Sequence, residues 1–341
     1  MILYRNNCRM SRKNSRVMGG VHKTVNSHNR SNCCDCSCII DSCVIVWTQT
    51  GRYKELAGDI IMNKIMNKTL KYKGELANVD GHNIHIYRLG NIDKPKIMLM
   101  SGSGTVAPVY DFKILYEKLS KNFRVIVIEK FGYGYSDIFD SPADIDTIVS
   151  TQKKALETMG ENGPYILMPH SMSGIEALRW IQMYPDDVEA IIGNDMCTPL
   201  TYSVWTTEKI EKKIKMMKFA TKYKLQGLLC PLSNRCLTKF EISQHKLLRK
   251  RNAFNICCIN ESKEILNNVN IVKNVGYPQC PVLLFSSNGK QTQEYWTKAQ
   301  QKFAIILNAK LIRYCCGHYI HHYKSNEMCE EIINFVNSLE S

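Results

Sequence analysis

The chain has 341 residues, of which 45 are Lys or Arg and 31 are Asp or Glu, so its formal net charge is +14. Hydrophobic residues make up 44% of the sequence, a share typical of globular proteins that excludes wholesale disorder. No stretch approaches the roughly 18–20 apolar residues that a membrane-spanning helix needs. No fixed repeat period recurs, which excludes collagen-like and coiled-coil arrays. The composition indicates a soluble, basic, globular protein.

The 15 cysteines are concentrated near the N-terminus, where six of them precede residue 60. An odd number of cysteines without a secretory signal predicts a reducing compartment, and we expect the protein in the cytoplasm. The thiols of residues 33–38 suit a soft metal, but no second Cys pair or His pair stands at zinc spacing, so we expect no metal site. Residues 1–61 are interpreted as an unassigned, poorly ordered leader, and Met62 and Met66 are candidates for the natural start.

From residue 69 onward, apolar runs alternate with segments of helical periodicity. Residues 70–76 and 84–87 alternate polar and apolar side chains around Asp80-Gly81, which predicts a hairpin. Further strands are predicted at 95–100, 124–128, 165–168, 188–192, 282–285 and 310–314, and helices at 106–120, 144–159, 175–183, 294–307 and 327–339. This alternation predicts an α/β fold with a mostly parallel sheet covered by helices. In such a sheet the carboxyl ends of the parallel strands share one edge, where the site is expected.

One predicted strand runs directly into a helix through Pro169-His170-Ser171-Met172-Ser173-Gly174. Such a sharp turn lifts the serine hydroxyl above the sheet edge and directs backbone N–H groups of the helix toward the same point. An acyl-transfer nucleophile requires both features, although a lone serine at this place is more often a helix N-cap.

This segment resembles the nucleophile elbow of the α/β-hydrolase superfamily, usually Gly-x-Ser-x-Gly. Three more motifs appear in the family's order: Ser101-Gly102-Ser103-Gly104 after one strand, Gly132-Tyr133-Gly134-Tyr135-Ser136 after the next, and Gly317-His318 after the last. The resemblance covers roughly residues 69–341 and implies an α/β-hydrolase domain over residues 62–341.

The elbow departs from the usual pattern, because Pro169 and Ser173 replace its outer glycines. Proline is tolerated at the end of a strand, and serine is small enough for close packing of strand and helix. We interpret the motif as a subgroup variant with Ser171 as the nucleophile. Ser173 is the rival candidate, but it falls inside the start of the helix.

The resemblance implies His318 as the general base and then acid. The remaining histidines are expected mostly at the surface or in loops, with His170 packed beneath the nucleophile. The family's usual position for the acid holds Asn288, which carries no charge. Asp195, at the end of the strand after the nucleophile helix, is the preferred acid over Asn288 and Glu294.

For the oxyanion hole, the resemblance implies the backbone N–H groups of Met172 and Ser103. It implies no organic cofactor and no metal. A serine at the elbow excludes the aspartate nucleophile of dehalogenase-like and epoxide-hydrolase-like members.

Residues 200–275 interrupt the alternating pattern where the family inserts a helical cap. Residues 201–275 hold 15 basic and five acidic residues, a net charge of +10. A solvated, Lys-rich helical face explains this charge best, and no nucleic-acid motif accompanies it. We expect no specific nucleic-acid partner and at most weak attraction to anionic surfaces.

The sequence thus predicts a serine hydrolase that cleaves a small acyl substrate, most simply a carboxylic ester, through an acyl-serine intermediate. An aminopeptidase, lactonase, thioesterase or acyltransferase with the same triad stays open. A non-catalytic binding protein of the same fold also stays open, since a fold does not dictate a function.

Overall fold

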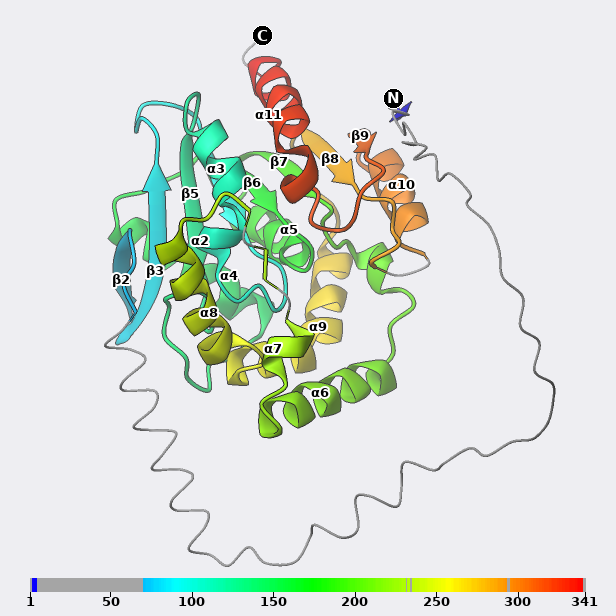
Figure 1. Ribbon diagram of the computed structural model, residues 1–341. Helices are drawn as coiled ribbons and strands as arrows, with labels where there is room; N and C mark the ends of the chain where they lie inside the picture. The colour runs from blue at the N-terminus through cyan, green and yellow to red at the C-terminus, as the bar shows by residue number, and fades with distance from the viewer. Residues whose placement is uncertain (1, 5–69, 231, 234, 293–294, 340–341) are drawn as a thin grey trace, which may run out of the picture. The chain divides into compact units, whose positions relative to one another are not determined.

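The computed structural model describes residues 2–4, 70–230, 232–233, 235–292 and 295–339. In this part of the chain, nine strands form one sheet in the order β1-β9-β8-β7-β6-β4-β5-β3-β2 (Figure 1). The strands are β1 (Ile2–Tyr4), β2 (Glu75–Val79), β3 (His82–Leu89), β4 (Lys96–Met100), β5 (Arg124–Glu129), β6 (Tyr165–Pro169), β7 (Val188–Asn194), β8 (Val282–Ser286) and β9 (Lys310–Arg313). Apart from β1, the leader predicted over residues 1–61 lies outside the described residues.

The sheet is mostly parallel, as the sequence predicts. Every neighbouring pair from β1 to β5 in the sheet order is parallel, whereas β3 pairs antiparallel with both β5 and β2. Strand β6, which leads to the elbow, lies between β4 and β7 in the interior of the sheet. The prediction of an α/β fold is confirmed.

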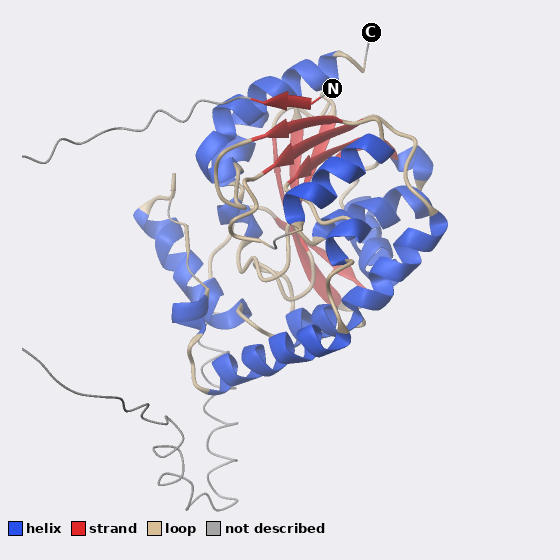
Figure 2. Cartoon of the chain, turned by 90° about the vertical axis from the view of Figure 1, so that its right-hand side faces the viewer, coloured by secondary structure: helices blue, strands red, loops and turns tan. Residues whose placement is uncertain are grey.

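Helices cover both faces of the sheet (Figure 2). They are α2 (Pro108–Asp111), α3 (Lys113–Leu119), α4 (Ile145–Thr158), α5 (Ser173–Met183), α6 (Thr207–Lys222), α7 (Gln226–Leu229), α8 (Lys239–Asn252), α9 (Ile256–Val275), α10 (Trp296–Ile306) and α11 (His321–Asn337). Successive side chains of β4 point to opposite faces, so Met98 and Met100 join one hydrophobic core while Ile97 and Leu99 join the other. Both faces are therefore buried, as expected for near-continuous apolar strands.

Three predicted elements differ clearly from the structure. The single helix predicted over residues 106–120 is divided at Phe112 into α2 and α3. The first hairpin strand begins at Glu75 rather than at residue 70. The last helix begins at His321 rather than at residue 327, and Lys324 interrupts it with a non-helical φ of −130°. This irregular first turn breaks the apolar period, which explains why periodicity indicates only the later part of α11.

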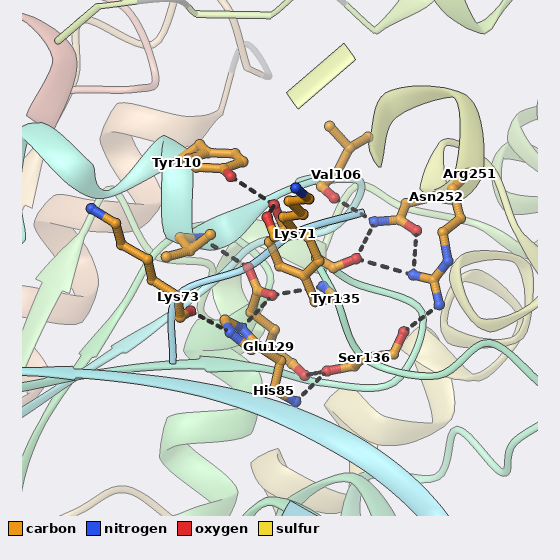
Figure 3. A network of polar contacts seen from close by, with 12 residues as sticks. Lys71, Lys73, His85, Val106, Tyr110, Glu129, Tyr135, Ser136, Arg251 and Asn252 are labelled. Atoms are coloured by element: carbon orange, nitrogen blue, oxygen red, sulfur yellow. Dashed lines mark hydrogen bonds and ion pairs between the residues drawn. The ribbon is translucent and has the colours of Figure 1, made fainter. Parts of the chain in front are cut away.

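Four helices, α6 to α9, follow one another between β7 and β8, and we call them the cap helices. The end of α8 is joined to two core loops. The Asn252 side-chain amide donates to the carbonyl oxygens of Val106 (2.6 Å) and Gly134 (2.7 Å), and Arg251 donates to those of Gly134 and Ser136 (Figure 3). None of the helices in the described ranges is long and apolar enough to cross a membrane.

The loop after β5 is held by the buried carboxylate of Glu129 (Figure 3). Its oxygens accept hydrogen bonds from the backbone N–H of Val109 (2.9 Å) and of Tyr135 (2.8 Å), and one of them pairs with His85 Nδ1 (2.8 Å). A buried carboxylate is tolerated when its oxygens are paired in this way. Glu129 thereby fixes the loop that contacts the cap helices.

Candidate active site

Ser171 stands between the end of β6 and the start of α5, in a backbone conformation that L-residues rarely adopt. Its φ is +56°, which disfavours any residue with a Cβ. The Ser171 carbonyl accepts hydrogen bonds from the N–H groups of Gly174 (3.0 Å) and Cys197 (2.7 Å), which hold the turn in place. A strained turn that its surroundings fix in this way is typical of a functional position.

Glycines allow the neighbouring segments to approach this turn closely. A Cβ added to Gly102 would lie 2.6 Å from the Cβ of Ser171, and one added to Gly174 would lie 2.1 Å from the carbonyl oxygen of Cys197. The loop after β4 and the loop after β7 therefore both pack directly on the elbow. Larger residues at these two positions would push the loops away.

Ser173, the rival nucleophile, is fully buried. Its hydroxyl donates toward the carbonyl oxygens of Met100 (2.8 Å) and His170 (2.9 Å). These bonds tie the start of α5 to the end of β4. Ser173 is thus engaged in the fold, whereas Ser171 is partly accessible.

His318 and Asp195 are brought together although 123 positions separate them in the sequence. The Nδ1 atom of His318 lies 2.6 Å from Oδ2 of Asp195, and the carboxylate is fully buried. Because Nδ1 donates to the carboxylate, Nε2 of the neutral ring keeps its lone pair and can accept a proton. The His318 side chain is 15% exposed, so its ring reaches the site surface.

Two further groups fix the other oxygen of the Asp195 carboxylate. Oδ1 accepts from the backbone N–H of Ser287 (2.9 Å) and from Nε1 of Trp296 (2.8 Å), and the Trp296 ring also packs edge-on against His318. Neither donor was predicted from the sequence. Trp296 sits at the start of α10 with no motif around it, so only the folded arrangement reveals its role.

Asn288 and Glu294 were the alternative candidates for the acid that orients His318. The Asn288 side chain accepts from the backbone N–H of Lys290 (3.0 Å), so it stabilises its own loop. Glu294 lies outside the described residues. The backbone N–H of His318 is held by the side chain of Gln291 (3.0 Å), which the sequence analysis also did not single out.

His170 is buried beneath the site, and its ring lies 4.7 Å from that of His318. Burial first, and then the neighbouring His318 and His321, lower the pKa of His170 well below its ordinary value. His170 therefore stays neutral and does not compete as a base near neutral pH. His170 is thus buried as expected. The expectation that the other histidines lie mostly at the surface or in loops is wrong for the described residues, because His85, His245 and His321 are buried within a strand or a helix.

A cavity of about 380 Å³ opens beside these groups. Ser171, His318, Met172 and Ser103 all line it, so the expected nucleophile, base and oxyanion donors face one space. Its other walls come from core loops and from cap residues (Cys197, Tyr202, Trp205, Lys213, Met216, Met217, Phe254, Trp296 and Tyr319). A volume of this size suits a small organic molecule.

One cluster in the described part of the chain has the residue types of a metal site, namely Asp111, His321 and His322. Both histidines contact the Asp111 carboxylate, at 3.1 and 3.2 Å, and His321 Nδ1 also contacts the amide of Asn194 at 2.9 Å. Burial raises the pKa of Asp111, but these hydrogen bonds outweigh it and hold that pKa below the ordinary value. Hydrogen bonding and charge pairing account for the cluster, which joins the end of α2 to the start of α11.

No family model matches the chain. It is 43% identical over 143 residues to the uncharacterized protein YbdG of Bacillus subtilis (strain 168), and this match spans 42% of the chain and 44% of that protein's length.

Among solved structures, it resembles a thermophilic esterase from Thermogutta terrifontis (TM-score 0.61, 14% identity, 79% of this chain and 100% of that one). It also resembles an enol-lactonase from Burkholderia xenovorans LB400 (0.56, 16%, 77% and 100%) and a haloalkane dehalogenase variant from Bradyrhizobium elkanii (0.59, 13%, 78% and 96%). The sheet order, the elbow and these likenesses agree, and the chain has the α/β-hydrolase fold.

Proposed function

We propose that the protein is a serine hydrolase that cleaves a small carboxylic ester through an acyl-serine intermediate. One observation carries this proposal. Ser171, in a strained turn, lines the same cavity as His318, whose Nδ1 is hydrogen-bonded to the buried carboxylate of Asp195. A nucleophile, a base and a group that orients the base are the parts that acyl transfer requires.

In the proposed reaction, the Ser171 hydroxyl attacks the ester carbon while Nε2 of His318 takes its proton. The carbonyl oxygen becomes an oxyanion and accepts hydrogen bonds from the backbone N–H groups of Met172 and Ser103. The intermediate then collapses, and the leaving alcohol receives the proton from His318. Asp195 stabilises the imidazolium that forms in between, without itself being protonated.

A water molecule completes the cycle. It attacks the acyl-serine carbonyl, His318 takes its proton, and that proton returns to Ser171 as the carboxylic acid leaves. Removing one oxyanion donor from such a site typically costs about 3–4 kcal/mol of barrier stabilisation. The esterase and the enol-lactonase among the structural neighbours are consistent with hydrolysis of a carboxylic ester on this fold.

The test is covalent labelling of the full chain by a fluorophosphonate probe, together with hydrolysis of 4-nitrophenyl butyrate. The wild-type protein is expected to label and to turn over the ester. Ser171→Ala and His318→Ala should abolish both signals. Asp195→Asn should lower kcat by about 10⁴-fold, because the histidine then loses its orientation and its counter-charge.

Ser173→Ala is the matched control, because it removes a hydroxyl two residues away. It is expected to lose stability through its two hydrogen bonds yet to keep the labelling. A folded wild-type protein that neither labels nor hydrolyses the ester would contradict the proposal and leave a binding protein of this fold. Labelling that persists in Ser171→Ala would place the nucleophile elsewhere.

A further inference from the structure

Helix α6 presents one of its faces to the cavity that contains Ser171. Lys213, Met216 and Met217 all line this cavity, and their spacing of three and four residues places them on the same side of the helix. The neighbouring Lys212 and Lys215 are exposed to solvent instead. Lys213 is therefore set apart from the other lysines of this basic helix by its position.

Lys213 brings a positive charge to the wall of this cavity. None of the described residues that line the cavity is an Asp or a Glu. In the described part of the chain, no hydrogen bond or ion pair joins the Lys213 ammonium to another residue. By contrast, Lys212 pairs with Glu208 at 2.8 Å and Lys209 donates to the carbonyl of Val204 at 2.6 Å.

The nearby acidic group is already engaged. Glu261 of α9 attracts Lys213 electrostatically, but its carboxylate pairs with Lys130 (2.9 Å) and accepts from the hydroxyl of Tyr133 (2.5 Å). Burial lowers the pKa of Lys213, and the charge of Glu261 opposes this only in part. A half-buried ammonium without a close partner is costly, and an anion bound beside it would offset that cost.

The remaining surface of the cavity restricts what such an anion can be attached to. Trp205, Phe254 and Trp296 contribute aromatic rings, and Met216 and Met217 contribute flexible apolar side chains. With a volume of about 380 Å³, the cavity has room for a short apolar chain rather than a polymer. The lining thus combines one cationic group with an apolar wall.

We propose that Lys213 binds an anionic group of the substrate, so that the preferred substrate is a small ester bearing a carboxylate. This inference rests on the proposed function and names the substrate class of the same site. Lys213 acts as a specificity-determining residue and takes no part in the proton transfers.

The experiment compares esters that differ by one carboxylate. On the acyl side these are 4-nitrophenyl hemiglutarate and the neutral 4-nitrophenyl valerate. On the alcohol side they are 4-carboxyphenyl valerate and phenyl valerate. The wild-type protein is expected to prefer one anionic ester over its neutral partner in kcat/KM, and the preferred pair identifies the side of the ester that carries the charge.

Lys213→Met should lower kcat/KM for the preferred anionic ester by about 10–100-fold, the usual effect of losing a charge-assisted hydrogen bond. Its kcat/KM for the neutral partner should stay within about threefold of the wild type. Lys215→Met removes the same charge from the exposed side of α6 and should leave both esters within about twofold. Equal losses of kcat/KM in Lys213→Met and Lys215→Met would overturn the inference. They would indicate that the summed positive charge of the cap helices, and not Lys213 itself, attracts the anionic ester.

A second measurement needs no turnover. Glutarate is added to the fluorophosphonate reaction, where it should slow labelling of the wild type more than labelling of Lys213→Met. The role of Lys213 would be contradicted if glutarate protected the two proteins equally. It would also be contradicted if the wild type hydrolysed the neutral esters without preferring either anionic one. Both outcomes would leave the proposed hydrolase activity intact. Absence of labelling in the folded wild type would instead contradict the hydrolase itself.

Discussion

Two residues of the site, Ser171 and Asp195, have positive φ angles of 56° and 47°. Conformations of this kind cost about 1–3 kcal/mol each in residues other than glycine, so the surroundings must hold them. The Ser171 carbonyl accepts two hydrogen bonds and the Asp195 carboxylate accepts three. At the residue scale, the site is therefore kept in shape by backbone N–H groups and one indole, in addition to the contact between His318 and Asp195.

A substitution at Gly102 tests how closely the loop after β4 must approach Ser171. In Gly102→Ala, the new Cβ would lie 2.6 Å from the Ser171 Cβ and 2.9 Å from the carbonyl oxygen of His170. We expect the loop to move by about 1 Å, with a loss of about 10²-fold in kcat/KM because misplacement on that scale disrupts the reacting geometry. The assay is hydrolysis of 4-nitrophenyl butyrate, with circular dichroism to verify the fold.

Gly227→Ala is the matched substitution. The nearest atom to its added Cβ is 3.8 Å away, and Gly227 lies in the short helix α7, where alanine is favoured. This variant should keep full activity. Equal activity in both variants would show that the contact between Gly102 and Ser171 is not required.

The sequence identifies the residues that carry the proposed chemistry better than those that support them. Ser171, His318 and Asp195 each follow a recognisable strand, and the order of these strands places them at one sheet edge. Trp296 and Lys213 come from helices, where the side that faces the cavity depends on packing. Their roles follow only from the three-dimensional arrangement.

At the scale of elements, the cap helices and the predicted oxyanion loop share one residue. Asn252, at the end of α8, is almost fully buried and donates to the carbonyls of Val106 and Gly134. Val106 lies two residues after Gly104, so this amide holds the end of the loop that contains Ser103. The position of the cap and the shape of that loop are thereby coupled.

We expect Asn252→Ala to lower the free energy of unfolding by about 2 kcal/mol, because two buried hydrogen bonds are lost. The Val106 carbonyl keeps the N–H of Gly134 as a donor, and the Gly134 carbonyl keeps Arg251. It should also reduce kcat for neutral and anionic esters alike, since the loop after β4 loses a support. Urea unfolding and steady-state kinetics on the same preparations measure both effects.

Asn260→Ala offers the comparison for that element. The Asn260 amide also links a cap helix to the core, but its contact with Asp140 is exposed to solvent and its bond to the Ser141 carbonyl (3.2 Å) is only partly buried. Water replaces such a bond, so this variant should lose less than about 1 kcal/mol and keep its kcat. A similar loss in both variants would mean that the link through Asn252 has no special importance.

Elements were predictable to different degrees. The strands β4 to β9 are short apolar runs bounded by turn residues, and they appear where the pattern places them. The start of α11 did not follow from periodicity, because Lys324 interrupts its first turn. The four cap helices were expected only as one insertion, since their packing on the core depends on buried polar contacts such as that of Asn252, which no hydrophobic period encodes.

At the scale of the whole molecule, the interior holds several ionisable groups whose preferred charge state depends on burial. Burial lowers the pKa of His170 and of His321, and it raises the pKa of Glu261 despite the neighbouring Lys130. The neutral histidines stabilise the fold only while they remain unprotonated. The folded state is therefore expected to be sensitive to mild acid.

His245 on α8 gives this sensitivity a quantitative test. It is buried, its Nδ1 atom has no hydrogen-bond partner, and burial lowers its pKa from 6.5 to about 4. Because the unfolded chain binds the proton more tightly than the folded one, the contribution of His245 is complete above pH 6.5 and is lost as the pH falls toward 4. This lowering of the His245 pKa corresponds to a loss of about 2 kcal/mol in the free energy of unfolding between pH 7 and pH 5.

In His245→Gln, the side chain at this position cannot be protonated. The free energy of unfolding should therefore fall between pH 7 and pH 5 by about 2 kcal/mol less than in the wild type. Urea unfolding of both proteins at the two pH values measures it. The comparison uses only the change with pH within each protein, so a lower stability of the variant at pH 7 does not affect it. If both proteins lose the same free energy, His245 is already protonated in the folded state or relieved by water, and the acid sensitivity must come from His170 and His321.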